Sequence, residues 1–478
     1  MRTLFLIHRY LGIAVSVLMV SWCLSGIVMM YVSYPSLPEA QRVAALAPLE
    51  LRGCCTQLPD AGGIAPQSVV STVRVEMLAG RPVAEVVSVQ DGRMVLDLAN
   101  GRTVTVGLEG ARSVAMAFAR RFALPAPSIT DTVEWDQWTT SEQFERDRPL
   151  YRFSFDDREH TQLYVSPVSG AALQLTTASI RFWNWLGAVP HWIYFWPLRR
   201  HGYIWAQVTI YTSLIGCFLT LTGLYIGVRQ YRLRPARRAS PYRGYMFWHH
   251  IPGIAFGIFL FTWVASGLLS MTPWGFLEGG GADVERSLLA GRLQWQSVRG
   301  SLEHMGARPE NALRVSLRSA PLGGSLFWIA TSADGKRLRL NERGEPAPLS
   351  RLEWLLEARL LGGSSPPQLM SAEDTFYFEH HSEPMTLPVY RLVLPDAERT
   401  RYYLDPISGQ ILRKFDSNAR GYRWLHEALH RLDFARALRT RPLWDVLMMS
   451  LLAGSALVCA TGLYSAALRV SGRRGERM

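Results

Sequence analysis

The stretch Ile7-His8-Arg9-Tyr10-Leu11-Gly12-Ile13 opens an apolar run that ends at Leu24-Ser25-Gly26. A second stretch, Trp248-His249-His250-Ile251-Pro252-Gly253-Ile254, opens a similar run that ends at Ala265-Ser266-Gly267. A histidine, a glycine and a Ser-Gly pair recur at one offset of 241 residues (249 − 8; 267 − 26). Each run is long enough to cross a bilayer core, which needs about 20 residues. Because a polar ring in hydrocarbon is costly, each histidine is a candidate functional residue.

The composition favours a few membrane helices joined to large water-exposed parts. The chain has 478 residues, of which 48% are apolar, and its formal net charge is +12. A strongly basic balance often indicates a nucleic-acid partner. Here the basic residues flank the apolar runs, which is typical of membrane proteins. We therefore expect contact with membrane lipid and no nucleic-acid partner.

Four spanning helices are expected, at 1–33, 203–228, 246–272 and 443–468. The first run is too long for the apolar core of a signal peptide, and no small-residue cleavage site closes it, so we expect it to be retained. Arginines gather in the loop 229–245 and in the tail 469–478, and short Arg-rich loops stay in the cytoplasm. We expect a multi-pass protein of a bacterial inner membrane with both termini in the cytoplasm.

The long segments 34–180 and 273–420 would then face the periplasm as two α+β modules. Strand-like alternation occurs at 73–77, 103–106, 151–155 and 390–394. Asp91-Gly92, Asn100-Gly101 and Asp334-Gly335 are hairpin-turn signals. Amphipathic segments at 181–202 and 421–442 lead from each module to the next spanning helix, and we expect them at the periplasmic interface.

The repeat continues through these segments at an offset of 239 residues (409 − 170). Tyr164–Gly170 matches Tyr403–Gly409, His191 matches His430, and Thr222-Gly223-Leu224-Tyr225 matches Thr461-Gly462-Leu463-Tyr464. The chain therefore reads as an internal duplication of one unit: helix, module, amphipathic segment, helix. Because both units enter from the same side, we expect a parallel repeat about an axis along the membrane normal, with sites where the halves meet.

Three features resemble the PepSY-associated transmembrane family. They are the His8–Gly12 opening, the Tyr-Val-Ser-Pro-Val-Ser-Gly and Tyr-Leu-Asp-Pro-Ile-Ser-Gly turns, and Trp424-Leu425-His426 through His430. The resemblance covers essentially the whole chain. It implies a membrane α-helical bundle of four transmembrane helices with two periplasmic α+β PepSY-like modules. Characterised relatives include inner-membrane ferrisiderophore reductases that hold b-type haems, so the resemblance implies two haem b groups and an iron-related oxidoreductase.

The four repeat-matched histidines form two pairs, each with one ring from each half. His8 and His249 lie near the expected cytoplasmic ends of their helices, and His191 and His430 lie on the periplasmic side. A haem with two axial imidazoles fits such a pair. Three neighbours leave the ligand choice open, namely His250, His426 and His201. The alternative is that all of these rings are interfacial and hydrogen-bond headgroups or backbone.

Other chemistry-bearing residues give weaker signals. Tyr377, His380 and His381 are candidate contacts for an iron chelate, although we favour a solvated loop. The adjacent Cys54 and Cys55 are a weak candidate for a redox or metal feature. Three further cysteines lie in apolar runs and are expected to be inert packing residues: Cys23, Cys217 and Cys459.

The leading functional prediction is a di-haem electron conduit that reduces a periplasmic ferric siderophore or a similar chelate. No Gly-rich nucleotide or flavin fingerprint occurs, so the electrons would come from membrane quinol or a cytoplasmic donor. One alternative is a transporter or accessory permease for iron, another metal or a chelate, but the spanning runs hold almost no charge at mid-depth. Another is a haem-free scaffold whose modules bind a periplasmic partner.

Overall fold

The computed structural model of the chain describes residues 1–55, 58, 64–90, 92–231, 239–307, 314–379 and 385–471. The chain divides into two compact units, which we call the helical unit and the sheet unit. The helical unit comprises Met1–Tyr34, Ile180–Gly280 and Ser417–Met478, and the sheet unit comprises Pro35–Ser179 and Gly281–Asp416. Each unit therefore contains segments from both halves of the sequence.

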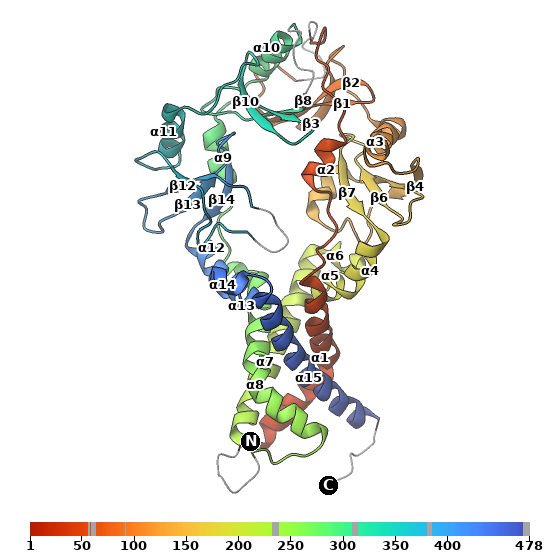
Figure 1. Cartoon of the computed structure of the whole chain (residues 1–478), viewed down its shortest axis with the longest axis vertical. Helices are drawn as coiled ribbons and strands as arrows, with labels where there is room; N and C mark the ends of the chain where they lie inside the picture. The colour runs from red at the N-terminus through yellow and green to blue at the C-terminus, as the bar shows by residue number, and fades with distance from the viewer. Residues whose placement is uncertain are drawn as a thin grey trace. The chain divides into compact units, whose positions relative to one another are not determined.

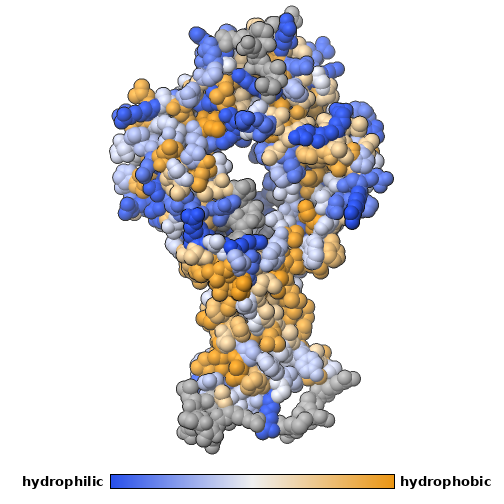
Figure 2. Space-filling model, viewed as in Figure 1, coloured by the Kyte–Doolittle hydropathy of each residue, from blue (hydrophilic) through white to orange (hydrophobic). Residues whose placement is uncertain are grey.

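Four long helices form the helical unit (Figure 1): α1 (Arg2–Met29), α7 (Gly202–Gln230), α8 (Tyr245–Ser270) and α15 (Leu443–Val470). Each is long and apolar enough to cross a membrane, and Figure 2 shows apolar residues gathered over their surface. Helix α1 has 28 residues and is therefore about 42 Å long, which exceeds a hydrocarbon core of about 30 Å. The four expected membrane helices are confirmed, and contact with lipid follows from them.

Close packing of small residues holds the four helices together. Helix α1 packs against α7 and α15, and α8 packs against the same two helices. A Cβ atom added to Gly454 of α15 would lie 2.5 Å from the Phe256 ring of α8, so only glycine fits there. Such contacts are common between membrane helices, where van der Waals packing replaces the hydrophobic effect.

Two runs of short helices precede α7 and α15. The first run is α4 (Ala178–Leu186), α5 (Ala188–His191) and α6 (Trp196–Arg199), and the second is α12 (Ser417–Tyr422), the π-helix η4 (Arg423–Ala428), α13 (Leu429–Arg431) and α14 (Arg436–Arg439). Helix α5 contacts α1, whereas η4 and α13 contact α8. These contacts bring His191 to α1 and His430 to α8. The 3-10 turn η3 (Pro273–Gly275) follows α8.

The sheet unit contains one six-stranded sheet with the order β10-β9-β8-β1-β2-β3. Its strands are β1 (Val70–Leu78), β2 (Arg81–Ser88), β3 (Gly92–Asp97), β8 (Arg314–Ser319), β9 (Phe327–Ser332) and β10 (Arg337–Asn341). Strand β1 pairs antiparallel with β8. Val75 lies opposite Leu317, and the flanking pairs are Arg74 with Arg318 and Glu76 with Ser316. The two long segments, which the sequence analysis treats as separate modules, therefore share one sheet.

Each long segment also forms a four-stranded antiparallel sheet of its own. The first contains β4 (Ser128–Val133), β5 (Leu150–Ser154), β6 (Gln162–Val165) and β7 (Ala172–Thr176), and the second contains β11 (Gln368–Met370), β12 (Val389–Val393), β13 (Arg401–Leu404) and β14 (Ile411–Phe415). Helix α3 (Gly107–Phe122) packs on the first sheet, and α11 (Arg351–Leu360) shares a buried cluster with the second. The remaining elements are α2 (Glu39–Ala44), η2 (Glu142–Asp147), α9 (Asp283–Ala290) and α10 (Trp295–Gly306).

The two four-stranded sheets contain the same buried polar contact. The Tyr164 hydroxyl donates to the Asp136 carboxylate at 2.6 Å, and the Tyr403 hydroxyl donates to the Asp374 carboxylate at 2.7 Å. Both tyrosine rings are fully buried. The contact ties a central strand of each sheet, β6 or β13, to the loop before its neighbouring strand, β5 or β12.

The strands expected at 73–77, 151–155 and 390–394 are confirmed by β1, β5 and β12. The strand expected at 103–106 is wrong. Thr103 makes a single bridge to Leu96, because the chain turns into α3 at Gly107. The turns at Asn100-Gly101 and Asp334-Gly335 have the expected positive φ at glycine, whereas Asp91 lies outside the described residues. Cys54 and Cys55 form a disulfide, so they are not a pair of thiolate ligands for a metal.

Candidate functional site

His8 of α1 lies against α7. Its Nδ1 atom is 3.1 Å from the carbonyl oxygen of Leu219 and 3.3 Å from the Thr222 hydroxyl. Because a carbonyl oxygen only accepts, Nδ1 carries the proton and Nε2 keeps its lone pair. A Cβ atom at Gly223 would lie 2.7 Å from Cε1 of the ring, so glycine provides the space for His8.

His249 of α8 makes the corresponding contacts with α15. Its Nδ1 atom is 3.1 Å from the carbonyl oxygen of Val458 and 3.2 Å from the Thr461 hydroxyl. A Cβ atom at Gly462 would lie 3.2 Å from Cε1 of this ring. The same tautomer therefore follows, with a free lone pair on Nε2.

The spacing of the two rings suits two ligands of one metal. The ring centroids of His8 and His249 are 6.3 Å apart. A bond between a metal and an imidazole nitrogen is about 2 Å long, and the nitrogen lies about 1 Å from the ring centroid, so two imidazoles that share a metal have centroids about 6 Å apart. Ligating histidines usually donate their other N–H to a carbonyl, carboxylate or water, as both rings do here to a carbonyl.

His191 and His430 form a second pair with the same design. Nδ1 of His191 is 3.0 Å from the Ser25 hydroxyl, and Nδ1 of His430 is 3.0 Å from the Ser266 hydroxyl. Both hydroxyls donate to backbone carbonyls of their own helices, so they accept from the imidazoles. The two ring centroids are 6.0 Å apart.

Small residues and burial also define the second pair. A Cβ atom at Gly26 would lie 3.7 Å from Cε1 of His191, and one at Gly267 would lie 3.7 Å from Cε1 of His430. Burial lowers the pKa of the His191 imidazole to about 4. The ring is therefore neutral near pH 7, which is the form that binds metals.

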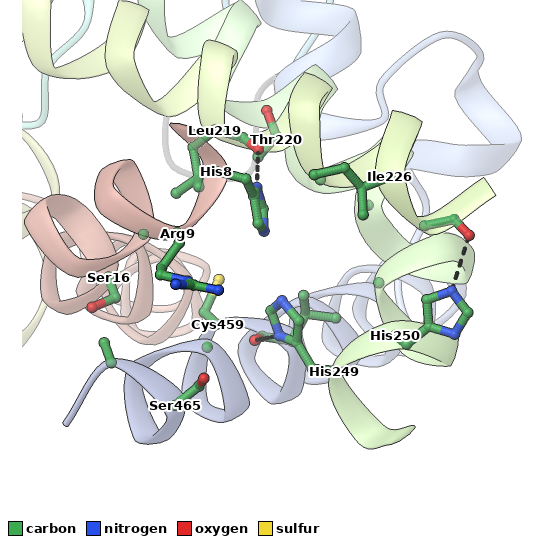
Figure 3. A pocket seen from close by; sticks show the side chains of 18 of the residues that line it. His8, Arg9, Ser16, Leu219, Thr220, Ile226, His249, His250, Cys459 and Ser465 are labelled. Carbon is green, nitrogen blue, oxygen red and sulfur yellow. Dashed lines mark hydrogen bonds between the residues drawn. The ribbon is translucent and has the colours of Figure 1, made fainter. Parts of the chain in front are cut away.

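A cavity of about 390 Å³ lies among the four long helices beside the first pair (Figure 3). Its walls are mainly apolar, with six glycines among the lining residues: Gly12, Gly223, Gly227, Gly253, Gly257 and Gly462. Arg9, Ser16 and Arg469 add polar groups to the lining. The Ser16 hydroxyl is buried and has no hydrogen-bond partner among the described residues. The cavity thus combines an apolar interior with a few polar groups, as small-molecule sites do.

The profile of the PepSY-associated TM region matches residues 5–326 of the chain. The chain belongs to this family. The matched range is well over half of the sequence and includes His8, His191 and His249, whereas His430 lies beyond it. No curated protein matches the chain.

In this member of the PepSY-associated family, the three alternative histidines occupy different surroundings. Both nitrogens of His250 are engaged, since Nε2 donates to the Gly227 carbonyl at 2.9 Å and Nδ1 is 2.8 Å from the Ser240 hydroxyl. His426 donates from Nδ1 to the Ser266 carbonyl at 2.8 Å, and its ring centroid lies 5.3 Å from that of His430. His201 is exposed at the start of α7 and accepts from Arg200 at 3.1 Å.

Of the three candidate chelate contacts, only Tyr377 lies within the described residues. Tyr377 is buried in the sheet unit, where its ring stacks on Tyr403 with a centroid distance of 4.8 Å. Its hydroxyl donates to the Thr386 carbonyl at 3.1 Å, so both the ring and the hydroxyl are already engaged within the protein. His380 and His381 lie outside the described residues.

The residues that hold the imidazoles were not predicted from the sequence. Ser25 and Ser266 are part of the quoted repeat, and so are the Thr-Gly pairs at 222–223 and 461–462. The signal was therefore present as matched positions. The matched positions do not show that these helix faces contact histidines of another segment, because the contacts join residues far apart in the sequence.

Proposed function

We propose that this membrane protein holds two haem b groups, one between His8 and His249 and one between His191 and His430. The observation that carries the proposal is the pair of ring spacings, 6.3 Å and 6.0 Å, each close to the value for two imidazoles on one metal. Each pair takes one ring from each half of the chain. A structural role for a single histidine would require neither this spacing nor its recurrence.

The hydrogen bonds of the rings support the choice of ligands. In each of the four residues Nδ1 is held as a donor, which leaves Nε2 as the ligating atom. His250 is excluded as a ligand in this arrangement because protein groups occupy both of its nitrogens. His426 has the same tautomer as His430 and is the remaining alternative at the second pair.

The cavity beside the first pair supports a flat, largely apolar group with acidic substituents. Six glycines among its lining residues leave room between the apolar side chains, and Arg9 and Arg469 supply guanidinium groups that suit the two propionates of a haem. When bound, haem supplies reversible one-electron transfer at its iron. The protein's own residues hold the iron, fix the tautomers of the ligands and exclude water.

We further propose that the chain is an internal duplication in a bacterial inner membrane. The contact of His8 with Leu219 corresponds to that of His249 with Val458. The contact of Ser25 with His191 likewise corresponds to that of Ser266 with His430. This correspondence supports the duplication. The arginines around 229–245 and in the tail support cytoplasmic termini. The Cys54–Cys55 disulfide supports an oxidising compartment such as the periplasm for the segments of the sheet unit.

The proposed activity is the reduction of a periplasmic ferric siderophore or a similar chelate with electrons from quinol or a cytoplasmic donor. His8 and Ser25 are 17 residues apart on α1 (25 − 8), so the two pairs lie about 25 Å apart along this helix. A protein with one redox centre near each end of its membrane helices carries electrons across the membrane. Hard oxygen ligands bind the smaller and more highly charged ferric ion more tightly than the ferrous ion, so reduction releases the iron.

The test is to reduce the purified protein with dithionite, remove the reductant and add a ferric siderophore. We expect the haem spectrum to reoxidise while a ferrous chelator traps the released Fe(II). His191→Ala and His430→Ala should abolish this reoxidation, whereas His8→Ala and His249→Ala should spare it. Reoxidation that persists without the second pair would contradict the proposed exit. If the purified protein contains no haem, the reductase proposal fails. The transporter and the haem-free scaffold are then the remaining functions.

A further inference from the structure

Two cysteines of the helical unit face each other across a helix contact. The sulfur atoms of Cys23 in α1 and Cys459 in α15 are 4.0 Å apart, and both residues are free thiols. They are 3% and 7% exposed, so they lie within the bundle. Because both lie in apolar runs, their sequence positions predict inert packing residues.

Each cysteine lies close in sequence to a residue that contacts one of the two histidine pairs. Cys23 is two residues before Ser25, which contacts His191 of the second pair. Cys459 follows Val458, whose carbonyl oxygen contacts His249 of the first pair. Cys459 also lines the cavity beside the first pair (Figure 3).

We propose that Cys23 and Cys459 are a reversible dithiol–disulfide couple that stores two electrons between the two histidine pairs. The proposal rests on the haem function proposed above for its electron acceptors. A disulfide has a sulfur–sulfur distance of about 2.05 Å, so the sulfurs must approach each other by about 2 Å. The proposal requires the two side chains to rotate towards each other across the contact between α1 and α15.

The electrons and atoms of the step balance. On oxidation two S–H bonds break and one S–S bond forms, and the two protons leave through the cavity that Cys459 lines. The two electrons pass singly to iron(III) acceptors of the haem class at the two histidine pairs. The reverse step takes two electrons and two protons from the donor.

Such a couple would raise the number of electrons that one chain can hold, from two on the proposed haems to four. A quinol releases two electrons, whereas each ferric ion accepts one. A two-electron store beside one-electron centres lets a complete two-electron donation precede two separate reductions of iron. The third free cysteine, Cys217 of α7, is half-buried and provides an internal reference thiol.

The first experiment counts thiols in the full-length purified protein before and after oxidation with diamide, which accepts two electrons and two protons. Denatured samples are then labelled with a maleimide mass tag. In a Cys54→Ser, Cys55→Ser background, which removes the other disulfide from the count, we expect the protein to lose two of its three labelled thiols and to regain them with a reducing phosphine. In the same background, Cys23→Ser and Cys459→Ser should lose none, and Cys217→Ser should lose both of its thiols. Three labelled thiols after oxidation of the background protein would overturn the proposal.

The second experiment counts electrons. Protein reduced with phosphine and dithionite is desalted without oxygen and titrated with a ferric chelate. In a Cys54→Ser, Cys55→Ser background, which removes the other disulfide from the count, we expect the protein to deliver two electrons per chain beyond its haem content. Adding Cys23→Ser or Cys459→Ser to this background should leave only the haem electrons. Equal electron counts would overturn the store. If the protein holds no haem, the haem proposal fails, while the thiol count still decides whether the couple exists.

Discussion

At the scale of single residues, the imidazoles of the first pair depend on two glycines. An added methyl group would lie 2.7 Å from the His8 ring at Gly223 but 3.2 Å from the His249 ring at Gly462. Helix α7 packs against α1 and α8, so we expect the ring to move in response. We expect Gly223→Ala to lower the haem content at the first pair several-fold and Gly462→Ala to lower it less. The measurement is haem per protein after purification.

Gly300→Ala is the matched control, because nothing lies within 4 Å of the added methyl group on α10. It should leave the haem content unchanged. Equal haem loss in all three alanine variants would show that the glycines act through general stability and would contradict the proposed contact.

Glu357 of α11 is a buried carboxyl with one oxygen that has no hydrogen-bond partner in the described part of the chain. Burial raises its pKa from the ordinary value of 4.5 to about 9. The folded protein therefore holds a proton that the unfolded chain releases above pH 4.5. Stability should fall as the pH rises from about 4.5 towards 9, by up to about 1.4 kcal/mol per pH unit. Glu357→Gln should remove this dependence.

The measurement is the midpoint of denaturant unfolding of the full chain between pH 5 and pH 8, followed by tryptophan fluorescence. Glu342→Gln, which changes an exposed side chain, is the control and should keep the wild-type slope. If the wild-type protein and Glu357→Gln have the same dependence on pH, the carboxyl is not protonated in the fold.

At the scale of elements, the helices were predictable and the shared sheet was not. Runs of apolar residues determine α1, α7, α8 and α15 almost by themselves, because a spanning helix satisfies its own backbone. The failed strand at 103–106 has the right alternation, but α3 begins directly after it. Alternation of apolar and polar residues does not show whether a strand has room to form before the next helix begins.

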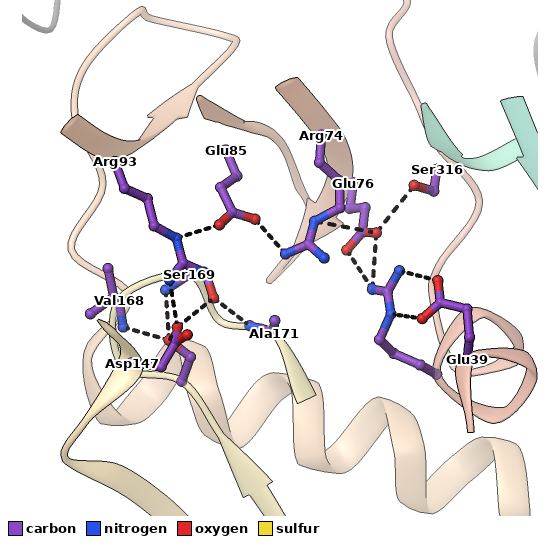
Figure 4. A network of polar contacts seen from close by, with 12 residues as sticks. Glu39, Arg74, Glu76, Glu85, Arg93, Asp147, Val168, Ser169, Ala171 and Ser316 are labelled. Atoms are coloured by element: carbon purple, nitrogen blue, oxygen red, sulfur yellow. Dashed lines mark hydrogen bonds and ion pairs between the residues drawn. The ribbon is translucent and has the colours of Figure 1, made fainter. Parts of the chain in front are cut away.

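The pairing of β1 with β8 leaves no local signal, because it joins residues about 240 positions apart. The contact is recognisable only in three dimensions (Figure 4): the Ser316 hydroxyl of β8 donates to Glu76 of β1 at 3.1 Å. Glu76 also accepts from Arg42 of α2 at 3.0 Å, and Arg93 of β3 binds Asp147 at 2.9 Å. In the sequence, each of the four charged residues resembles an ordinary surface charge.

The shared sheet gives a test at this scale. Leu317 is fully buried at the β1–β8 contact and belongs to the largest apolar cluster of the sheet unit. Leu317→Asp should destabilise the sheet unit by about 3–5 kcal/mol, because it buries an unpaired charge. Limited proteolysis should then cut the chain within both long segments. Leu338→Asp on β10 is the control, because that side chain is 43% exposed and should cost about 0.5 kcal/mol or less.

Proteolysis confined to the second segment of Leu317→Asp would contradict a shared sheet. It would indicate two modules that fold independently, as the sequence analysis assumed.

At the scale of the whole molecule, the internal repeat made the candidate site predictable. It matched His8 with His249 and His191 with His430 before any contact was known. The choice of His249 over His250 rested on the repeat alone, and the hydrogen bonds of His250 now give it a physical reason. The cavity was not predictable, because no sequence pattern reports the space that Gly223 and Gly462 leave between helices.

Membrane orientation is the next prediction for the whole molecule. Because arginines gather near 229–243, reporter fusions after Gly170 and Gly409 should be active in the periplasm, and a fusion after Arg469 should be active in the cytoplasm. A cytoplasmic signal at Gly170 or Gly409 would overturn the proposed direction of electron flow.

We propose above that two matched histidine pairs each hold one haem. The most direct measurement is the haem content of the purified protein, from its reduced-minus-oxidised spectrum, in the wild type and in single alanine variants. We predict two haems in the wild type, one after His8→Ala or His249→Ala, and one after His191→Ala or His430→Ala. His250→Ala and His201→Ala should keep both. Wild-type protein without haem, or variants of the four histidines that keep both haems, would contradict the account.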